Sequence, residues 1–206
     1  MKRLIFLVLT LLVFNTAKAE TEALKSGVFD PPRLAPDFVL QSSQGNELDF
    51  KQTRGKIVVL EFGFTHCTEV CPVTLANLVQ VRKKLGDLAK DVQVVYVTVD
   101  PAQDTPERLR EYLAIFDPTF IGVTGTEKQL AAVQKEYGIV AAKALGNQVH
   151  HSSYIYLIDT SGYLRALVPF GKSADDIAHD IKILLQNPTD KIPNPKVLND
   201  KKVASQ

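Results

Sequence analysis

The chain of 206 residues is poor in the residue types that bind soft metals: it has two cysteines, one methionine and four histidines, and it lacks tryptophan entirely. The methionine is the initiator Met1. The cysteines, Cys67 and Cys71, are four positions apart. Any disulfide, thiol redox or thiolate-metal chemistry of this protein therefore has to involve this one pair.

The chain also has no excess of charge of either sign, since 24 Lys and Arg oppose 23 Asp and Glu. A nucleic-acid-binding domain usually carries a basic patch or stripe, so this balance indicates no nucleic acid partner. The length and a hydrophobic content of 45% fit one globular domain with a sizeable core.

No apolar run reaches the roughly 20 residues that a membrane-spanning helix needs. The main apolar run, Leu4 to Phe14, follows Lys2 and Arg3 and precedes the small-x-small sequence at residues 17–19. This pattern predicts a signal peptide over residues 1–19, with cleavage after Ala19 favoured over a retained anchor. No cysteine follows the run, which excludes a bacterial lipid anchor. We expect an exported, periplasmic protein, in a compartment where disulfides persist.

The remaining chain divides by composition into three parts. Residues 20–35 are polar and contain Pro31 and Pro32, which predicts a linker. Residues 36–186 carry the periodic apolar patterns of a folded domain. Residues 187–206 have little apolar content, which predicts a disordered tail.

Strand and helix patterns alternate along the domain. A short hairpin is expected from residues 37–40 and 48–50. Further strands are expected at 57–64, 92–99, 120–123, 152–158 and 163–168, and helices at 72–89, 106–116, 126–137 and 173–185. This order predicts an α/β fold, in which a central mixed sheet is flanked by helices and ligands gather at the carboxyl ends of strands.

The cysteines lie where the strand at 57–64 gives way to a helix, and Pro72 fits the first turn of that helix. A helix N-terminus favours thiolate over thiol, so it lowers the pKa of a nearby cysteine. Two thiolates on one metal ion lie roughly 3.8 Å apart, which this spacing allows. The three-residue spacer also permits a disulfide, although the two-residue spacer of thioredoxin-type oxidoreductases suits that bond better.

A metal held by two thiolates needs a further ligand, which the four histidines can supply. His179 lies among acidic residues of the last predicted helix, where a solvated surface side chain is expected. His66 is adjacent to Cys67, which makes chelation awkward. His150 and His151 begin the strand at 152–158, whose side chains alternate between faces, so position alone does not choose between them.

Three ordered motifs resemble those of the Sco/SenC family of copper proteins, which assist assembly of cytochrome c oxidase. The resemblance covers about residues 35–186. The motifs are Gly63-Phe64-Thr65-His66-Cys67-x-x-x-Cys71-Pro72, Asp100-Pro101-x-x-Asp104-Thr105-Pro106 with Gly122-x-Thr124-Gly125-Thr126, and His151-Ser152 with Tyr156-Leu157-Ile158. The resemblance implies a thioredoxin-like fold of the peroxiredoxin-like branch, with an N-terminal β-hairpin.

The resemblance also implies a ligand set of Cys67, Cys71 and His151, because the family's ligand histidine is followed six residues later by a strand leucine, here Leu157. Two positions depart from the family. His150 stands where Asp is common, which leaves it as an alternative or transient ligand, and Gln103 stands where an Arg is common.

The function implied is that of a copper chaperone carrying Cu(I) or Cu(II). Its partner would be the copper-bearing subunit of cytochrome c oxidase or another copper chaperone. Thiolates suit Cu(I), and a structural zinc site prefers four ligands.

The alternative is a thiol-disulfide oxidoreductase that reduces the partner's cysteines before metal enters. A peroxidase, for which Arg82 would be the supporting arginine, is the least supported because neither cysteine has a threonine three residues before it.

Overall fold

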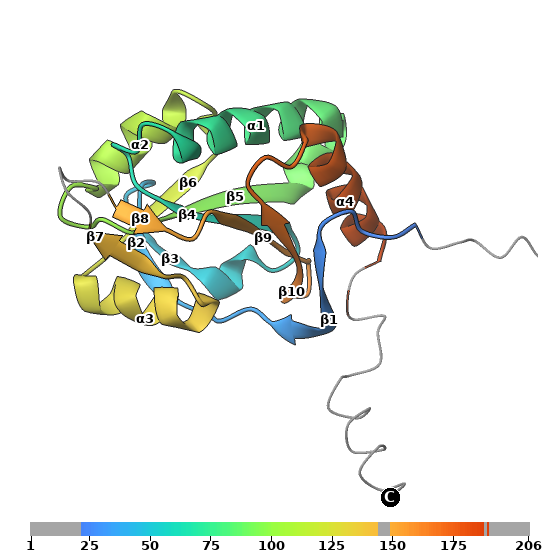
Figure 1. Cartoon of the computed structure of the whole chain (residues 1–206), viewed down its shortest axis with the longest axis horizontal. Coiled ribbons are helices and arrows are strands. Elements are labelled where there is room, and N and C mark those ends of the chain that lie inside the picture. The colour runs from blue at the N-terminus through green and yellow to red at the C-terminus, as the bar shows by residue number, and fades with distance from the viewer. Residues whose placement is uncertain (1–21, 144–148, 188, 190–206) are drawn as a thin grey trace, which may run out of the picture.

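The computed structural model describes residues 22–143, 149–187 and 189 (Figure 1). The predicted signal peptide and all of the predicted tail except residues 187 and 189 lie outside this range. Among the described residues, no helix is long and apolar enough to cross a membrane.

An eight-stranded mixed sheet forms the centre of the protein, with strand order β1-β10-β9-β4-β5-β6-β2-β3. The strands are β1 (Gly27–Leu34), β2 (Val39–Ser42), β3 (Glu47–Asp49), β4 (Ile57–Gly63), β5 (Val92–Thr98), β6 (Ile121–Thr124), β9 (Tyr154–Ile158) and β10 (Tyr163–Pro169). Strands β4, β5 and β6 pair in parallel, and the other neighbours are antiparallel. The predicted hairpin is confirmed as β2 and β3.

The strand that leads to the cysteines lies in the middle of the sheet. Every residue of β4 is buried, as its β-branched and apolar sequence predicts. It pairs along its whole length with β5 on one side, and with β9 on the other. The cysteine loop therefore leaves from a strand that is held on both edges.

Helices cover both faces of the sheet (Figure 1). The helices α1 (Val70–Leu85), α2 (Pro106–Ala114) and α4 (Ala174–Gln186) pack on one face, and α3 (Glu127–Tyr137) on the other. Two short 3-10 helices, η1 (Phe50–Thr53) and η2 (Gly86–Asp91), complete the layers. The sheet thus separates two apolar cores.

The helix ends follow local signals in the sequence. Thr105 caps α2 by accepting a hydrogen bond from the Arg108 N–H, and Pro106 is its first residue. Thr126 caps α3 in a capping box, and Gly138 ends it at φ 69°. The helix predicted to run to residue 89 ends earlier, at Leu85, because the backbone turns at Gly86 (φ 57°) into η2.

The prediction of a linker over residues 20–35 is wrong for residues 27–34. These residues form β1, which pairs with β10 at the edge of the sheet. The Ala35 N–H also donates to the Gly162 carbonyl. Local sequence misled here because two adjacent prolines normally interrupt strands, yet an edge strand tolerates them. Most of β1 is solvent-exposed, so it shows no alternating apolar pattern either.

Two more segments differ from the expectation. A separate two-stranded ribbon forms from β7 (Ala141–Lys143) and β8 (Val149–His151), where no such pair was predicted. At the start of the predicted tail, Thr189 is buried and donates hydrogen bonds from its N–H and hydroxyl to the Asp159 carboxylate. The tail therefore begins as an ordered part of the domain.

Candidate functional site

The two cysteines lie at the carboxyl end of β4 and the N-terminus of α1, as predicted. Cys71 is the second residue of α1 and only 1% exposed, whereas Cys67 in the preceding loop is partly exposed. The Cys71 N–H donates to Cys67 Sγ at 3.5 Å, and the Cys67 N–H donates to the Phe64 carbonyl at 3.3 Å. Neither thiol is in a disulfide, and both belong to one turn of chain.

The helix N-terminus does not dominate the titration of Cys71. Burial raises the pKa of the Cys71 thiol far above its ordinary value, with smaller contributions from Cys67 and the Glu61 carboxylate, and a backbone hydrogen bond involving Phe64 only partly opposes this. The expectation that the helix lowers the pKa is therefore wrong for this cysteine, because desolvation is the larger effect.

The buried carboxylate of Asp104 holds the start of the cysteine loop through hydrogen bonds. Asp104 is fully buried and accepts hydrogen bonds from the Thr65 N–H at 3.1 Å, the Thr65 hydroxyl at 2.7 Å and the Thr98 hydroxyl at 2.6 Å. Arg108 Nε also donates to the Thr65 hydroxyl at 3.2 Å. Charged hydrogen bonds in a low-dielectric interior are strong, so this network ties the loop to β5 and α2.

Sequence reasoning did not assign Asp104 this role. Its signal was present, because Asp104 and Thr65 belong to two of the motifs that carried the family resemblance. What the sequence could not show is that these two residues, 39 positions apart, form a hydrogen bond with each other.

His66 contacts two residues of the motifs that carry the family resemblance, Asp100 and Phe64. Its Nε2 lies 3.4 Å from Asp100 Oδ2, and its ring packs edge-on against Phe64 at 4.7 Å between centroids. The expectation that His66 is too close to Cys67 to chelate the same ion stays a prediction.

The backbone register indicates where His151 lies. β9 runs antiparallel to β4, with Ile155 opposite Glu61. The residues before Tyr154 therefore extend past the carboxyl end of β4, where the cysteine loop also begins. His151 ends β8 and is paired with Ala141 of β7. The side chains of His150 and His151 lie outside the described part of the structure, so the choice between them stays a prediction.

The other two candidate residues lie elsewhere. His179 on α4 is 3.0 Å from Glu22 and 3.1 Å from Asp180, away from the cysteines in the fold. Arg82 pairs with Asp117 at 2.9 Å and donates to the Ala89 and Val92 carbonyls near the C-terminus of α1. The peroxidase hypothesis thereby loses its supporting arginine.

Within the described residues no three His, Cys, Asp or Glu side chains are grouped as a metal site. The two thiols still fit a soft metal ion, because they share one turn and neither is consumed in a disulfide. A third ligand would have to come from the edge to which the β9 register brings residues 150 and 151.

Known proteins resemble this chain in sequence and in fold. The family model described as SCO1/SenC matches residues 28–186, which includes all of β1 except its first residue. The SCO2-like protein of Rickettsia felis is 34% identical over 143 residues, covering 66% of this chain and 70% of that protein. Among solved structures, Bradyrhizobium japonicum ScoI with copper bound is 30% identical (TM-score 0.68), covering 74% of this chain and 100% of that one.

Yeast Sco1 with copper bound is also similar, at 28% identity and a TM-score of 0.69, covering 79% of this chain and 97% of that one. These likenesses confirm the thioredoxin-like α/β fold that the sequence motifs implied.

Proposed function

Because the chain belongs to the SCO1/SenC family, we propose that it is an exported copper chaperone whose cargo is one copper ion. Cys67 and Cys71 supply two thiolate ligands, and His151 supplies an imidazole nitrogen. The observation that carries this proposal is that the two thiols share one turn without forming a disulfide, and that the Cys71 N–H donates a hydrogen bond to Cys67 Sγ within it.

Two thiolates and one imidazole suit copper better than zinc, the main competing metal. Thiolates favour Cu(I), imidazole accepts both Cu(I) and Cu(II), and three protein ligands leave a position for an incoming ligand from a partner. Structural zinc prefers four protein ligands. The similar proteins of Bradyrhizobium and yeast have been solved with copper bound, which supports the same cargo here.

The partly exposed Cys67 gives the ion a route to a partner, while Cys71 stays covered. The family resemblance points to the copper-bearing subunit of cytochrome c oxidase, or another copper chaperone, as that partner. The signal-peptide pattern over residues 1–19 supports export to the periplasm.

Copper titration with X-ray absorption spectroscopy on the reduced chain tests the proposal. We expect one copper per chain, with two sulfur ligands and at least one nitrogen ligand. Cys67→Ala, Cys71→Ala and His151→Ala should each abolish tight binding, whereas the matched variant His150→Ala should retain it. Wild-type affinity in His151→Ala would contradict the ligand assignment.

The difference in exposure between the cysteines favours one second candidate, a thiol-disulfide oxidoreductase. In that function Cys67 and Cys71 are oxidised to a disulfide while a disulfide of the partner is reduced to two thiols. Rapid turnover on a disulfide-containing partner in the absence of copper would support it, and dependence on copper would count against it.

A further inference from the structure

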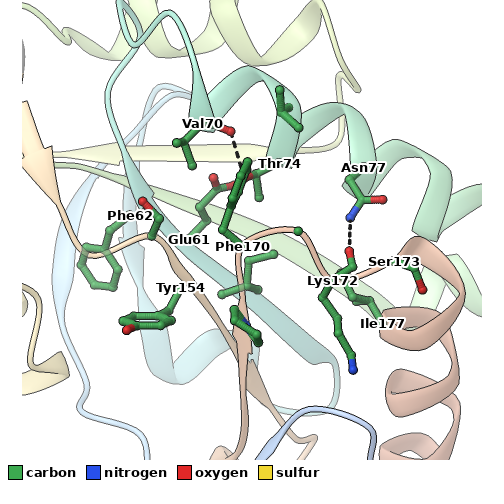
Figure 2. A pocket seen from close by; sticks show the side chains of 15 residues that line it. Glu61, Phe62, Val70, Thr74, Asn77, Tyr154, Phe170, Lys172, Ser173 and Ile177 are labelled. Carbon is green, nitrogen blue, oxygen red and sulfur yellow. Dashed lines mark hydrogen bonds between the residues drawn. The ribbon is translucent and has the colours of Figure 1, made fainter.

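A cavity of about 280 Å³ opens beside the cysteine pair, on the α1 side of the sheet (Figure 2). Its walls come from the end of β4, the first turns of α1, the start of β9, the turn at 169–173 and the first turn of α4. Val70, which immediately precedes Cys71, is one of its lining residues. The cavity therefore reaches the residue next to one of the two cysteines.

Large apolar side chains around this cavity remain exposed. Val73 is 57% exposed, Phe170 51% and Tyr154 42%, and all three line it. Exposed apolar side chains that gather around a cavity are typical of a binding site, whereas single exposed apolar residues scattered over a surface are normal.

A polar group without a partner lies in the same cavity. Glu61 of β4 is 4% exposed and lines the cavity, and no described residue forms a hydrogen bond with its Oε2. Figure 2 shows the side chain beneath Thr74 and Phe170. Buried polar atoms are nearly always paired, so an unpaired oxygen at an open cavity indicates a place for a donor from a ligand.

The walls are held in place before anything binds. Asn77 Nδ2 donates to the Lys172 carbonyl at 2.9 Å, which fastens the 169–173 turn to α1. The Thr74 hydroxyl donates to the Val70 carbonyl at 3.0 Å within the first turn of the helix. A preformed cavity binds with little ordering cost.

The size of the cavity limits its occupant. A cavity of about 150 Å³ holds benzene, whereas drug-sized ligands occupy about 300 to 1,000 Å³. This one, at about 280 Å³, has room for one aromatic side chain with its first methylene groups. Walls that carry large apolar side chains and one buried acceptor without a partner fit an aromatic ring that carries a donor, which describes tyrosine and tryptophan.

We propose that the cavity receives one tyrosine or tryptophan side chain of the protein that docks over Cys67 and Cys71, with its O–H or N–H donating to Glu61. This inference rests on the proposed function, since it is metal exchange that brings a partner protein to this surface. A neighbouring aromatic anchor would hold the two proteins together while the ion moves.

The absence of tryptophan from the chain makes the test direct, because indole fluorescence then comes only from the probe. The purified full chain is titrated with N-acetyltryptophanamide, and by NMR with N-acetyltyrosinamide and N-acetylphenylalaninamide. We expect shifts at the Val73, Tyr154 and Phe170 amides. The tyrosine probe should bind about three- to tenfold more tightly than the phenylalanine probe, as one added hydrogen bond predicts.

Glu61→Met removes the acceptor at similar length, so the preference for tyrosine over phenylalanine should fall to about one. Glu61→Gln keeps an acceptor and should keep the preference. Phe170→Ala should weaken all three probes, whereas Ile115→Ala, which shortens a 77% exposed side chain outside the cavity, should weaken none. An unchanged preference in Glu61→Met, or shifts confined to other surfaces, would overturn the proposal.

Two further measurements separate the possible failures. Gly-Trp-Gly amide should bind at least as tightly as free indole; tighter binding of free indole would overturn a protein segment as the occupant. Copper stoichiometry is measured on the same wild-type preparation. Copper binding without aromatic binding rejects the cavity's role, and aromatic binding without copper binding rejects the proposed function.

Discussion

The buried carboxylate of Asp104 accepts hydrogen bonds from both the N–H and the hydroxyl of Thr65, two residues before Cys67. Through Thr98 the same carboxylate is joined to the end of β5. Asp104 thus links the cysteine loop to the neighbouring strand, and the position of the partly exposed thiol depends on this buried charge.

Asp104→Asn should loosen this link. An amide nitrogen replaces one accepting oxygen and faces a donor, so we expect a loss of about 1 to 3 kcal/mol in the free energy of unfolding. Urea unfolding measures the stability, and copper titration should show weaker binding. The exposed Asp87→Asn is the matched control and should change neither quantity. Equal effects of the two variants would refute the role of Asp104.

A second relationship constrains the residue at which β4 ends. A Cβ atom on Gly63 would lie 2.6 Å from Tyr96 Cζ, and Tyr96 is fully buried in β5. Gly63→Ala should therefore displace the ring and cost about 1 to 3 kcal/mol of stability, as overpacking in a core does.

The double variant Gly63→Ala/Tyr96→Leu separates a steric clash from a general intolerance at this position. Removing the ring removes the clash, so adding Gly63→Ala to Tyr96→Leu should cost much less than adding it to the wild type. Thermal unfolding of the four proteins gives the coupling energy. A coupling near zero would show that the two residues do not compete for space.

The sequence predicted the central strands and the helices because their signals are local. The continuous apolar run of β4 needs no knowledge of distant residues, and neither do the caps that the structure shows at Thr105 and Thr126. β1 could not be predicted in this way, because it is a strand only through its pairing with β10, which lies more than 120 positions away in the sequence.

The same distinction holds for the site. Cys67 and Cys71 were found from scarcity and spacing, which are properties of the sequence. The hydrogen bonds between Asp104 and Thr65 arise from tertiary structure, as does the effect of burial on the Cys71 pKa. Glu61 did leave a trace, as the one charge within an apolar strand, but its place in a cavity beside Cys71 required the fold.

Truncation tests whether β1 belongs to the folded domain. A chain beginning at residue 35 loses the pairing with β10 and the Lys25 and Ser26 N–H groups that donate to the buried Asp180 at 2.7 and 3.0 Å. We expect it to be less stable by about 2 kcal/mol or more than a chain beginning at residue 22, as several hydrogen bonds are lost. Equal stability of the two chains would restore the linker interpretation.

His179 should make stability depend on pH. Its pKa is raised above the ordinary 6.5, first by the hydrogen bond with Asp180 and then by Glu22, while partial burial and Lys25 oppose the increase. Protonated His179 is therefore favoured in the folded state. Its contribution to stability is fully present below the unfolded pKa and is lost as pH rises through the raised folded pKa.

The measurement is the free energy of unfolding of wild type and His179→Gln at pH 5.5 and pH 8.5. The difference between the two proteins should be larger at pH 5.5, where the imidazolium pairs with both carboxylates. Lys182→Gln on the same helix changes an exposed side chain and leaves His179 with both of its carboxylates, so its effect should be the same at both pH values. A His179→Gln difference that grows toward pH 8.5 would reverse the sign and contradict the ion pairs described here.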